Sequence, residues 1–262
     1  MLTSFTNTRV QFTIRMLRSF DERNGRQGDL SPPGMDKSKN ANNKQPRNRK
    51  NRRKTMSAFK VRKGKMEDLQ AAYYICLKTG NHGADGERMY QDDPDALGRI
   101  FVGPYLAFEP EHSLILEDNE GICGYAFAAF DSKGFYERYE KEWRPKLCAE
   151  FPMPEADQTQ WTPVQQVHSW YHEPDYHCPE PYEQYPSHLH IDFLERARGH
   201  GFGRMLMEDL MRQLKQEGSP GAHLGVSIRN TPALGFYPKL GFKELDRVGG
   251  PDDGCIYLGK KL

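Results

Sequence analysis

The sequence predicts a protein of the α/β (α+β) class, with a mixed sheet that is flanked by helices. Three stretches of the sequence support this prediction. A short strand precedes a helix near residue 59, two strands joined by a turn follow at 113–130, and an apolar strand at 188–194 leads through a glycine-rich turn into an amphipathic helix. Strands that alternate with helical patterns are typical of sheets covered by helices. The chain has 262 residues, 37% of them hydrophobic, which is enough to bury a sizeable core.

The first part of the predicted domain shows clear helix and hairpin signals. Leu69, Ala72, Tyr73 and Cys76 recur at helical spacing. Asp-Asn-Glu-Gly at 118–121 supplies the residues that turns favour, so the strands on either side form an antiparallel hairpin. The expected elements are a strand at 59–62, helices at 67–79 and 95–108, strands at 113–117 and 122–130, and a helix at 135–143.

The second part opens with a long stretch, 144–187, that is rich in Pro, Glu, Tyr and His and has no sustained period. This composition predicts an inserted loop region, because loops of such length are usually functional or partly disordered. After the strand at 188–194, Phe202, Leu206 and Leu210 share one face of a helix that Gly218 ends. The other expected elements are a helix at 201–217, strands at 222–228, 242–246 and 256–259, and a short helix at 231–240.

Charge is distributed unevenly along the chain. Residues 1–57 carry 14 Lys and Arg against 4 Asp and Glu, a net charge of +10, whereas the remainder carries 23 against 32, a net charge of −9. Residues 24–54 have few aliphatic side chains and cannot bury enough apolar area to offset the entropy of ordering. We therefore expect a disordered basic extension at 1–57 and a folded domain at 58–262.

The composition of this extension suggests where the protein resides. Its basic run at 44–54 is typical of a nuclear-import signal or of weak contact with nucleic acid, and it lacks aromatic residues for base stacking. The first 20 residues are rich in Arg and hydroxyl side chains and contain no acid, as in mitochondrial transit peptides. An extension without function, or a true start at a later methionine such as Met56, is the alternative.

Cysteine spacing and apolar runs indicate a reducing compartment and no membrane span. The five cysteines lie far apart and form no Cys-x-x-Cys, so neither a disulfide framework nor a zinc ribbon is indicated. No run approaches the roughly 20 apolar residues that cross a bilayer. We expect a cytoplasmic or nuclear protein, or a mitochondrial one if the N-terminal segment is a targeting signal, without a membrane partner.

A turn with closely spaced glycines, Arg198-Gly199-His200-Gly201-Phe202-Gly203, joins the strand at 188–194 to the helix. Free N–H groups and the dipole at a helix start favour an anion, and glycines let phosphate approach the backbone. A dinucleotide-binding turn would have an acid about 20 residues onward at the end of the next strand, and none is present. The turn predicts a pyrophosphate site of another kind.

A second motif, VSIRNTPALGFYPKLGF at 226–242, follows one strand later. Together the two motifs resemble the GNAT superfamily of acetyl-CoA-dependent N-acetyltransferases, which implies a central, mostly antiparallel, twisted sheet flanked by helices. The segments at 95–106, 121–125 and 186–192 are similar to the histone-acetyltransferase-like domain of O-GlcNAcase and its stand-alone bacterial relatives. The positions that match the superfamily are Arg198, Gly201, Gly203, Asn230, Ala233, Phe236, Tyr237, Gly241 and Phe242.

The resemblance implies direct attack of a neutral amine on the thioester of acetyl-CoA within a ternary complex. Tyr237 is expected to protonate the departing thiolate and Asp192 to take a proton from the amine, with Glu117 and His190 as alternative bases. Structural roles are the competing interpretation: Asp192 would satisfy buried polar groups, and Tyr237 would be a core aromatic. The residues expected to bind acetyl-CoA are Leu194, Arg198, Gly199, Gly201, Gly203, Arg204 and Asn230.

Pro238 directly follows Tyr237 and predicts that the helix there ends or kinks, which would displace the hydroxyl. The histidines at 168, 172, 177, 188 and 190, with Cys178, lack a four-ligand pattern, so no metal is expected. The acceptor is a primary amine, either on a small molecule or on a protein lysine. The rival hypothesis is an inactive GNAT-like module that binds CoA or a partner protein.

Overall fold

The computed structural model describes residues 59–155, 157–251 and 254–262, so the predicted extension at 1–57 lies outside the described residues. One seven-stranded sheet runs in the order β1-β2-β3-β4-β5-β7-β6. Every neighbouring pair is antiparallel except β4 and β5, which confirms a mixed, mostly antiparallel sheet. The strands are β1 (Lys60–Lys63), β2 (Ser113–Asp118), β3 (Gly121–Ala129), β4 (Ser187–Phe193), β5 (Gly221–Ser227), β6 (Lys243–Val248) and β7 (Cys255–Lys261).

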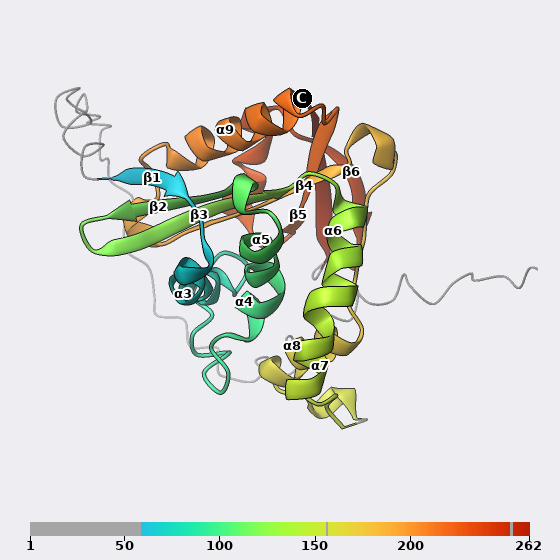
Figure 1. Ribbon diagram of the computed structural model, residues 1–262. Coiled ribbons are helices and arrows are strands. Elements are labelled where there is room, and N and C mark those ends of the chain that lie inside the picture. Colours follow the sequence, from blue (N-terminus) through green and yellow to red (C-terminus); the bar gives the residue numbers. More distant parts are fainter. Residues whose placement is uncertain (1–58, 156, 252–253) are drawn as a thin grey trace, which may run out of the picture.

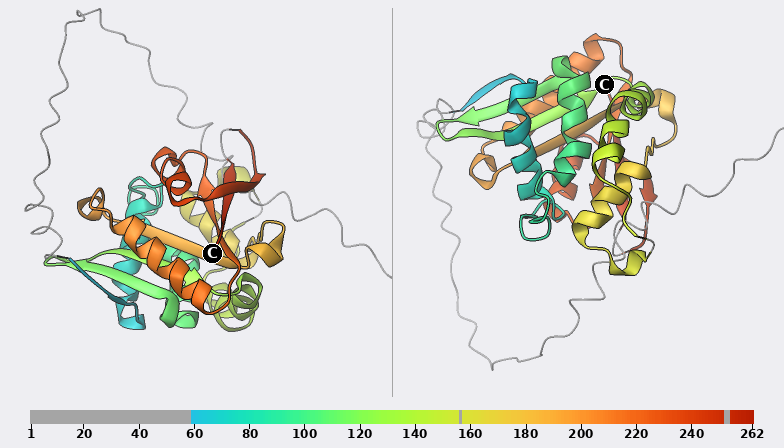
Figure 2. Two further views of the ribbon diagram at one scale, coloured as in Figure 1. Left: turned by 90° about the horizontal axis from the view of Figure 1, so that it is seen from above. Right: turned by 60° about the horizontal axis from the view of Figure 1, so that its bottom comes forward.

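Helices cover both faces of the sheet (Figure 1). The long helix α9 lies on one face, α3 to α5 lie on the other, and α6 to α8 stand along the same side near β4 and β5 (Figures 1 and 2). The α-helices are α3 (Leu69–Thr79), α4 (Ala96–Phe101), α5 (Gly103–Phe108), α6 (Ser132–Arg138), α7 (Arg144–Glu150), α8 (Pro163–His172), α9 (Phe202–Gln216) and α10 (Thr231–Leu234). The shorter helical turns are η1 (Met66–Asp68), η2 (Pro110–His112), η3 (Tyr139–Trp143), η4 (Gln158–Gln160), η5 (Tyr182–Gln184), η6 (Glu195–Ala197) and η7 (Tyr237–Leu240), of which η3 is π-helical.

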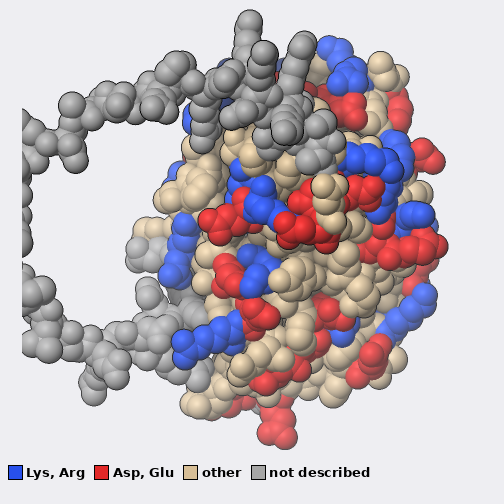
Figure 3. Space-filling view, turned by 90° about the vertical axis from the view of Figure 1, so that its left-hand side faces the viewer, with Lys and Arg blue, Asp and Glu red and all other residues tan. Residues whose placement is uncertain are grey.

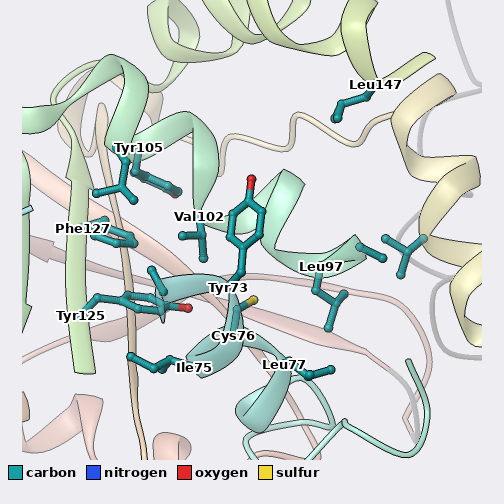
Figure 4. Close-up of a cluster of buried hydrophobic side chains, with 14 of the residues drawn as sticks. Tyr73, Ile75, Cys76, Leu77, Leu97, Val102, Tyr105, Tyr125, Phe127 and Leu147 are labelled. Carbon is teal, nitrogen blue, oxygen red and sulfur yellow. The ribbon is translucent and has the colours of Figure 1, made fainter. Parts of the chain in front are cut away.

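Strand β3 divides the core into two parts because its side chains alternate between the faces of the sheet. Tyr125 and Phe127 are fully buried among α3, α4 and α5, with their rings stacked 4.5 Å apart between centroids (Figure 4). Ala126 and Ala128 belong to the other part of the core, under α9. The donor and acceptor sites described below therefore rest on a strand that is packed on both faces.

Helix α9 has the amphipathic pattern that its sequence predicts. Phe202, Leu206, Leu210 and Leu214 recur every four residues, and all are buried against the sheet. Gly201 precedes the helix in a left-handed conformation, with φ at 91°, and provides no side-chain cap. The helix therefore begins with unsatisfied main-chain donors.

The prediction of a loop region at 144–187 is wrong in part, because the segment contains α7 and α8. Helix α8 begins with a capping box. The Thr162 hydroxyl accepts a hydrogen bond from the Gln165 N–H, and Gln165 Oε1 accepts one from the Thr162 N–H. Pro163 occupies the first turn, where its missing N–H costs nothing. This start signal was present in the sequence, but the many prolines nearby outweighed it.

Two expected helices are each interrupted at a proline. The helix expected at 95–108 is divided at Val102, whose φ and ψ are −130° and −54°, immediately before Gly103 and Pro104. The helix expected at 231–240 is divided into α10 and η7, and Pro238 lies in the first turn of η7. Proline has no N–H to continue a helix but is tolerated in a first turn, so each interruption restarts a short helix.

The parallel strands β4 and β5 pair at only two positions, Ser187 with Ala222 and His188 with His223. Beyond His188 the two strands diverge, although β4 continues to Phe193 and β5 to Ser227. The main chain of β4 that would bond to β5 in a continuous sheet is left without that partner. This opening in the middle of the sheet places the candidate site.

The packing of α9 on the sheet predicts a clear stability difference between two truncations. Leu210→Ala removes a fully buried side chain, and we expect it to lower the free energy of unfolding by about 2–5 kcal/mol. Met205→Ala is the matched change at a residue that is 38% exposed, and we expect it to cost less than about 1 kcal/mol. Urea unfolding of both variants measures the difference, and equal losses would contradict the packing described.

Candidate functional site

The turn before α9 presents a run of main-chain donors. Gly199 and Gly201 have positive φ, 76° and 91°, which L-residues with side chains rarely adopt. Within the described part of the chain, none of the N–H groups from Gly199 to Arg204 donates a hydrogen bond to the main chain or to a side chain. Six adjacent donors at a helix N-terminus form a site that suits a phosphate or pyrophosphate.

These donors border a groove of about 950 Å³. The groove brings together four segments far apart in sequence: the connection after α3, the end of β4, the glycine turn and the chain from Arg229 to Lys239. Its size suits a ligand larger than a simple metabolite. The lining residues are Asn81, His82, Gly83, Ala84, Ile191, Asp192, Phe193, Ala197, Arg198, Gly199, Gly201, Phe202, Gly203, Arg204, Arg229, Asn230, Pro232, Ala233, Phe236, Tyr237 and Lys239.

The main chain at the end of β4 faces the groove at Ile191 and Phe193, not at Leu194. The Leu194 N–H donates to Cys123 O at 2.9 Å, which directs it to β3. Because bonding alternates along an antiparallel pair, Asp192 also bonds to β3, while Ile191 and Phe193 face the opening beside β5. Leu194 does not line the groove, whereas Ile191 and Phe193 do.

The two arginines of the turn are engaged in holding it together. Arg198 donates to Phe193 O at 2.9 Å and to Gly83 O at 3.1 Å. Arg204 donates to Glu208 and to Lys239 O, both at 2.9 Å. Both residues line the groove as predicted, but their guanidinium groups brace the turn against neighbouring segments.

Two cations at the groove were missed in the sequence. Arg229 and Lys239 line it, and within the described residues neither side chain forms an ion pair with a carboxylate. The signal was available, because both flank the second motif, at positions next to Asn230 and Pro238. They are the side chains best placed to contact an anionic ligand.

Asn230 meets the adjacent backbone rather than open space. Its Oδ1 accepts from the Ala233 N–H at 3.2 Å and thereby caps α10. It also packs so closely on Gly83 that a methyl group at that glycine would lie 2.7 Å from Asn230 Nδ2. Asn230 therefore both starts α10 and seats the connection after α3, at the wall of the groove.

The connection after α3 forms a two-residue turn whose tip carries His82. Asn81 and Ala84 exchange main-chain hydrogen bonds of 3.0 and 2.8 Å, and His82 and Gly83 both have positive φ, 51° and 89°. These angles define a type I′ turn. The His82 ring bonds through Nδ1 to Ser227 Oγ at 2.8 Å, so the tip is fastened to β5.

Tyr237 is buried, lines the groove and forms no side-chain hydrogen bond within the described residues. Burial, and then the charge of Asp192, raise the pKa of its phenol above the ordinary value, so the hydroxyl keeps its proton. Pro238 shortens the helix as predicted, yet Tyr237 still reaches the groove. The phenol also packs on Phe236 and Phe242, so its predicted roles as core aromatic and as groove residue are combined.

Asp192 lies in the groove wall and accepts a hydrogen bond of 2.7 Å from the Tyr125 hydroxyl. His190 Nε2 is 3.4 Å from the same carboxylate oxygen, Oδ2. Burial raises the pKa of Asp192 above its ordinary value, an effect that His190 and Tyr125 partly oppose. Asp192 therefore takes up a proton more readily than an exposed aspartate does.

The alternative bases are placed differently. Glu117 pairs with Arg62 at 2.8 Å and with Lys60 at 3.3 Å, and it does not line the groove. Burial lowers the pKa of His190, which keeps this imidazole neutral, and its Nε2 lies 3.0 Å from the Tyr125 hydroxyl. The structure brings His190 to Asp192 and leaves Glu117 elsewhere on the sheet.

A second cavity, of about 370 Å³, lies in the opening between β4 and β5. His82 and Arg229 belong to its lining and to that of the groove, so the two spaces adjoin. His188, His190 and His223 also contribute to its wall. We call it the reaction cavity, because it adjoins the groove and because His190, the neighbour of Asp192, lines it.

Two histidines of the segment 144–187 have structural partners. His168 bonds to Asp93, and His172 bonds to Phe151 O, each at 2.8 Å. Among the residues that the structure describes, no three His, Cys, Asp or Glu side chains are arranged to hold a metal ion. The described helices also include none that combines the length and apolar character needed to cross a membrane.

Comparison with known proteins identifies the family. The model of the acetyltransferase (GNAT) family matches residues 83–242. Protein O-GlcNAcase of Rattus norvegicus is 27% identical over 209 residues, which are 79% of this chain and 22% of that protein. The chain thus spans about a fifth of the length of this relative.

Two further similarities agree with this assignment. The peptidyl-lysine N-acetyltransferase YjaB of Salmonella typhimurium is 41% identical over 60 residues, 21% of this chain and 38% of that one. The crystal structure of SsHAT matches with a TM-score of 0.70 and 33% identity, over 78% of this chain and 98% of that chain. The resemblance seen in the sequence motifs is confirmed, and the chain belongs to the GNAT acetyltransferase family.

Proposed function

We propose that this protein transfers the acetyl group of acetyl-CoA to a primary amine by direct attack in a ternary complex. The observation that carries the proposal is the run of six unbonded N–H groups from Gly199 to Arg204 beside a groove that adjoins the reaction cavity. An anionic donor in the groove and an amine in the cavity would meet at the opening of the sheet. Direct transfer needs this proximity.

The groove offers each part of acetyl-CoA a matching surface. The pyrophosphate fits the N–H groups of the glycine turn, with Arg229 and Lys239 as the nearby cations. The amide groups of the pantetheine arm fit the main chain of Ile191 and the N–H of Phe193, where they replace bonds that β5 would have made; Phe193 O already accepts from Arg198. The thioester is thereby led toward the reaction cavity.

The chemistry needs three proton transfers and no covalent enzyme intermediate. Asp192, directly or through a water molecule, takes one proton from the incoming ammonium, and the neutral amine attacks the thioester carbonyl. A main-chain N–H of β4 stabilises the oxyanion, the C–S bond breaks, and an amide C–N bond forms. Tyr237 supplies a proton to the CoA thiolate, and the second proton of the nitrogen passes to solvent water, from which the Tyr237 phenolate is reprotonated.

The rival hypothesis, an inactive binding module, predicts a fold that keeps its core but loses the donor site. Here the glycine turn, the divergence of β4 from β5 and both proton-transfer candidates are present together. Binding to nucleic acid rests on the extension at 1–57, outside the described residues. On the face shown in Figure 3, Lys and Arg side chains are interspersed with Asp and Glu, which provides no second basic surface.

Donor binding can be tested with a pair of glycines at the two ends of α9. Gly199 and Gly218 both have positive φ, 76° and 100°, and a methyl group at either would contact no other atom. Both Gly→Ala changes should destabilise the fold by a similar amount, on the order of 1 kcal/mol. Only Gly199→Ala should weaken CoA binding, by about tenfold or more, because the phosphate needs close approach to the backbone.

Isothermal calorimetry with CoA measures this difference. Wild-type protein that binds no CoA at millimolar concentration would exclude the acetyltransferase proposal. Equal affinities of the Gly199→Ala and Gly218→Ala variants would place the phosphate elsewhere.

The role of Tyr237 predicts a loss in turnover without a loss in donor affinity. Tyr237→Phe keeps the ring contacts and removes only the proton donor, so kcat should fall by about 100-fold. Tyr74→Phe, at a residue that is 50% exposed, is the control and should leave kcat unchanged. Thiol release is the assay, and a kcat of Tyr237→Phe within twofold of the wild type would assign this tyrosine to the core alone.

Asp192 predicts linked effects on activity and stability. Because the folded-state pKa lies above the ordinary value of 3.8, ionisation of this group costs the folded state free energy. The protonated Asp192 side chain contributes its full stabilisation when the pH is below its pKa in the unfolded state. This contribution is lost as the pH rises through its pKa in the folded state. Asp192→Asn should therefore raise the melting temperature at pH 7, with a gain that shrinks toward about pH 4.

The same variant should lose at least about 100-fold in kcat/KM, together with the limb of the pH profile that rises as Asp192 ionises. Thermal unfolding and pH profiles of kcat/KM test the two halves separately. A pH profile that keeps its acidic limb in Asp192→Asn would transfer the role of base to His190 or to His82.

A further inference from the structure

A third, smaller cavity adjoins the reaction cavity on the side away from the groove. It has a volume of about 110 Å³ and is built by α4, α5, α6, η3, α8 and the segment 173–176 after α8. Seven of its eleven lining residues are aromatic, two are acidic and none is basic. We call it the aromatic cage, and the residues that matter below are Phe101, Tyr136, Tyr139, Trp170, Glu173 and Asp175.

The aromatic cage and the reaction cavity share walls. Phe101, Tyr136, Trp170 and Asp175 line both. The three spaces therefore follow one another: the groove for the donor, the reaction cavity beside Asp192 and His190, and then the aromatic cage. A small molecule that reacts at the junction with the groove can extend its other end into the cage.

The charges around the cage select the sign of its occupant. Glu173 and Asp175 are exposed on the segment after α8, at the solvent side of the cage. Aromatic ring faces attract cations, and carboxylates nearby add to that attraction. An anionic group would meet two carboxylates there and no cation among the lining residues, so the cage suits a positive charge.

The histidines of the adjoining reaction cavity do not cancel this preference. Burial keeps the pKa of His188 well below its ordinary value and lowers that of His223 to about 4. Both imidazoles are thus neutral at physiological pH. Arg229, the one Lys or Arg that lines the reaction cavity among the described residues, lies at its junction with the donor groove. His177, also in that lining, pairs with Asp246 at 3.0 Å.

Tyr139 adds a specific feature to the cage. It begins the π-helical turn η3, is 3% exposed, and its hydroxyl has no hydrogen-bond partner within the described residues. Leaving such a group unsatisfied is costly, and a ligand with N–H donors can supply the missing bond. Single π-helical turns are frequent at functional sites.

We propose that the aromatic cage holds a second, non-reacting ammonium group of the acceptor, which makes the acceptor a small aliphatic diamine. This inference rests on the proposed acetyl transfer and specifies its substrate class. One amine loses a proton to Asp192, attacks the thioester and becomes an amide, while CoA leaves as the thiol. The distal ammonium keeps its proton and charge throughout, so the product is a monoacetylated diamine with a net charge of +1.

A matched panel of acceptors tests the distal charge. The compounds are 1,5-diaminopentane, 5-amino-1-pentanol, pentylamine and 5-aminopentanoate, which share one reactive amine and differ at the other end. We expect kcat/KM for the diamine to exceed that for pentylamine by at least about tenfold, since only the diamine brings a cation to the ring faces of the cage. Aminopentanoate should be the poorest acceptor.

A matched pair of variants tests the cage itself. Asp175→Asn should lower kcat/KM for the diamine by about tenfold and leave kcat/KM for pentylamine unchanged, because only the diamine reaches the carboxylate. Asp92→Asn makes the same change at an exposed acid that lines neither the cage nor the reaction cavity, and it should affect neither substrate. Calorimetric titration of 1,5-diaminopentane into the CoA-saturated protein gives a readout that needs no turnover.

The outcomes separate this inference from the proposed function. The proposed role of the aromatic cage would be rejected if pentylamine were acetylated as efficiently as the diamine, or if Asp175→Asn lowered kcat/KM equally for both substrates. The proposal of acetyl transfer would stand in either case. A lysine peptide preferred over every diamine of three to six carbons would also overturn the role of the cage. If no amine in the panel stimulated the release of the CoA thiol, the proposed function itself would be rejected.

Discussion

The divergence of β4 from β5 is the constraint on which the rest of the structure depends. Two paired residues hold the strands together, and then the sheet opens although neither strand has ended. Main-chain groups in the middle of a protein need partners, and here the missing partners can come only from a ligand or from solvent. The opening thus supplies, from one cause, the main-chain contacts of the donor groove and the space of the reaction cavity.

Neighbouring segments keep this opening from collapsing. Arg198 ties the glycine turn to Phe193 O and to Gly83 O, and His82, beside Gly83 in the turn after α3, ties that second turn to Ser227 on β5. These bonds span the two strands without filling the gap between them. The left-handed backbone at His82, uncommon for a residue with a side chain, is held because both ends of the turn and its tip are bonded.

Much of the donor site could be predicted from the sequence, because its parts are local. Glycine spacing, the amphipathic α9 and the Asn230 motif lie within about one supersecondary unit, and all of them line the groove or border it. Arg229, Lys239 and His82 were missed, since their role depends on segments brought together only by the fold. The direction of the Leu194 N–H toward β3 could not be predicted, because a strand alternates its main-chain bonds and the phase of that alternation depends on the partner strand.

The acceptor side was harder to predict for a different reason. Its walls come from α4, α5, α6, η3, α8 and the segment after α8. The stretch containing α8 was interpreted as a loop because its prolines and charges masked the period of Val164, Val167 and Tyr171. Aromatic residues scattered through such a stretch carry no signal of a shared cavity. Only tertiary packing shows that they surround one space.

The alternation along β4 also limits how this protein can change. His188, His190 and Asp192 point to the side of α3 and α5, while Leu189, Ile191 and Phe193 belong to the side of α9 or offer their main chain to the opening. Inserting or deleting one residue between Ser187 and Phe193 would exchange the two sets, since a shift of one reverses every side chain of a strand. A substitution in β4 therefore changes one side chain on one face, whereas a change in its length would displace both the residues that line the groove and those that line the reaction cavity.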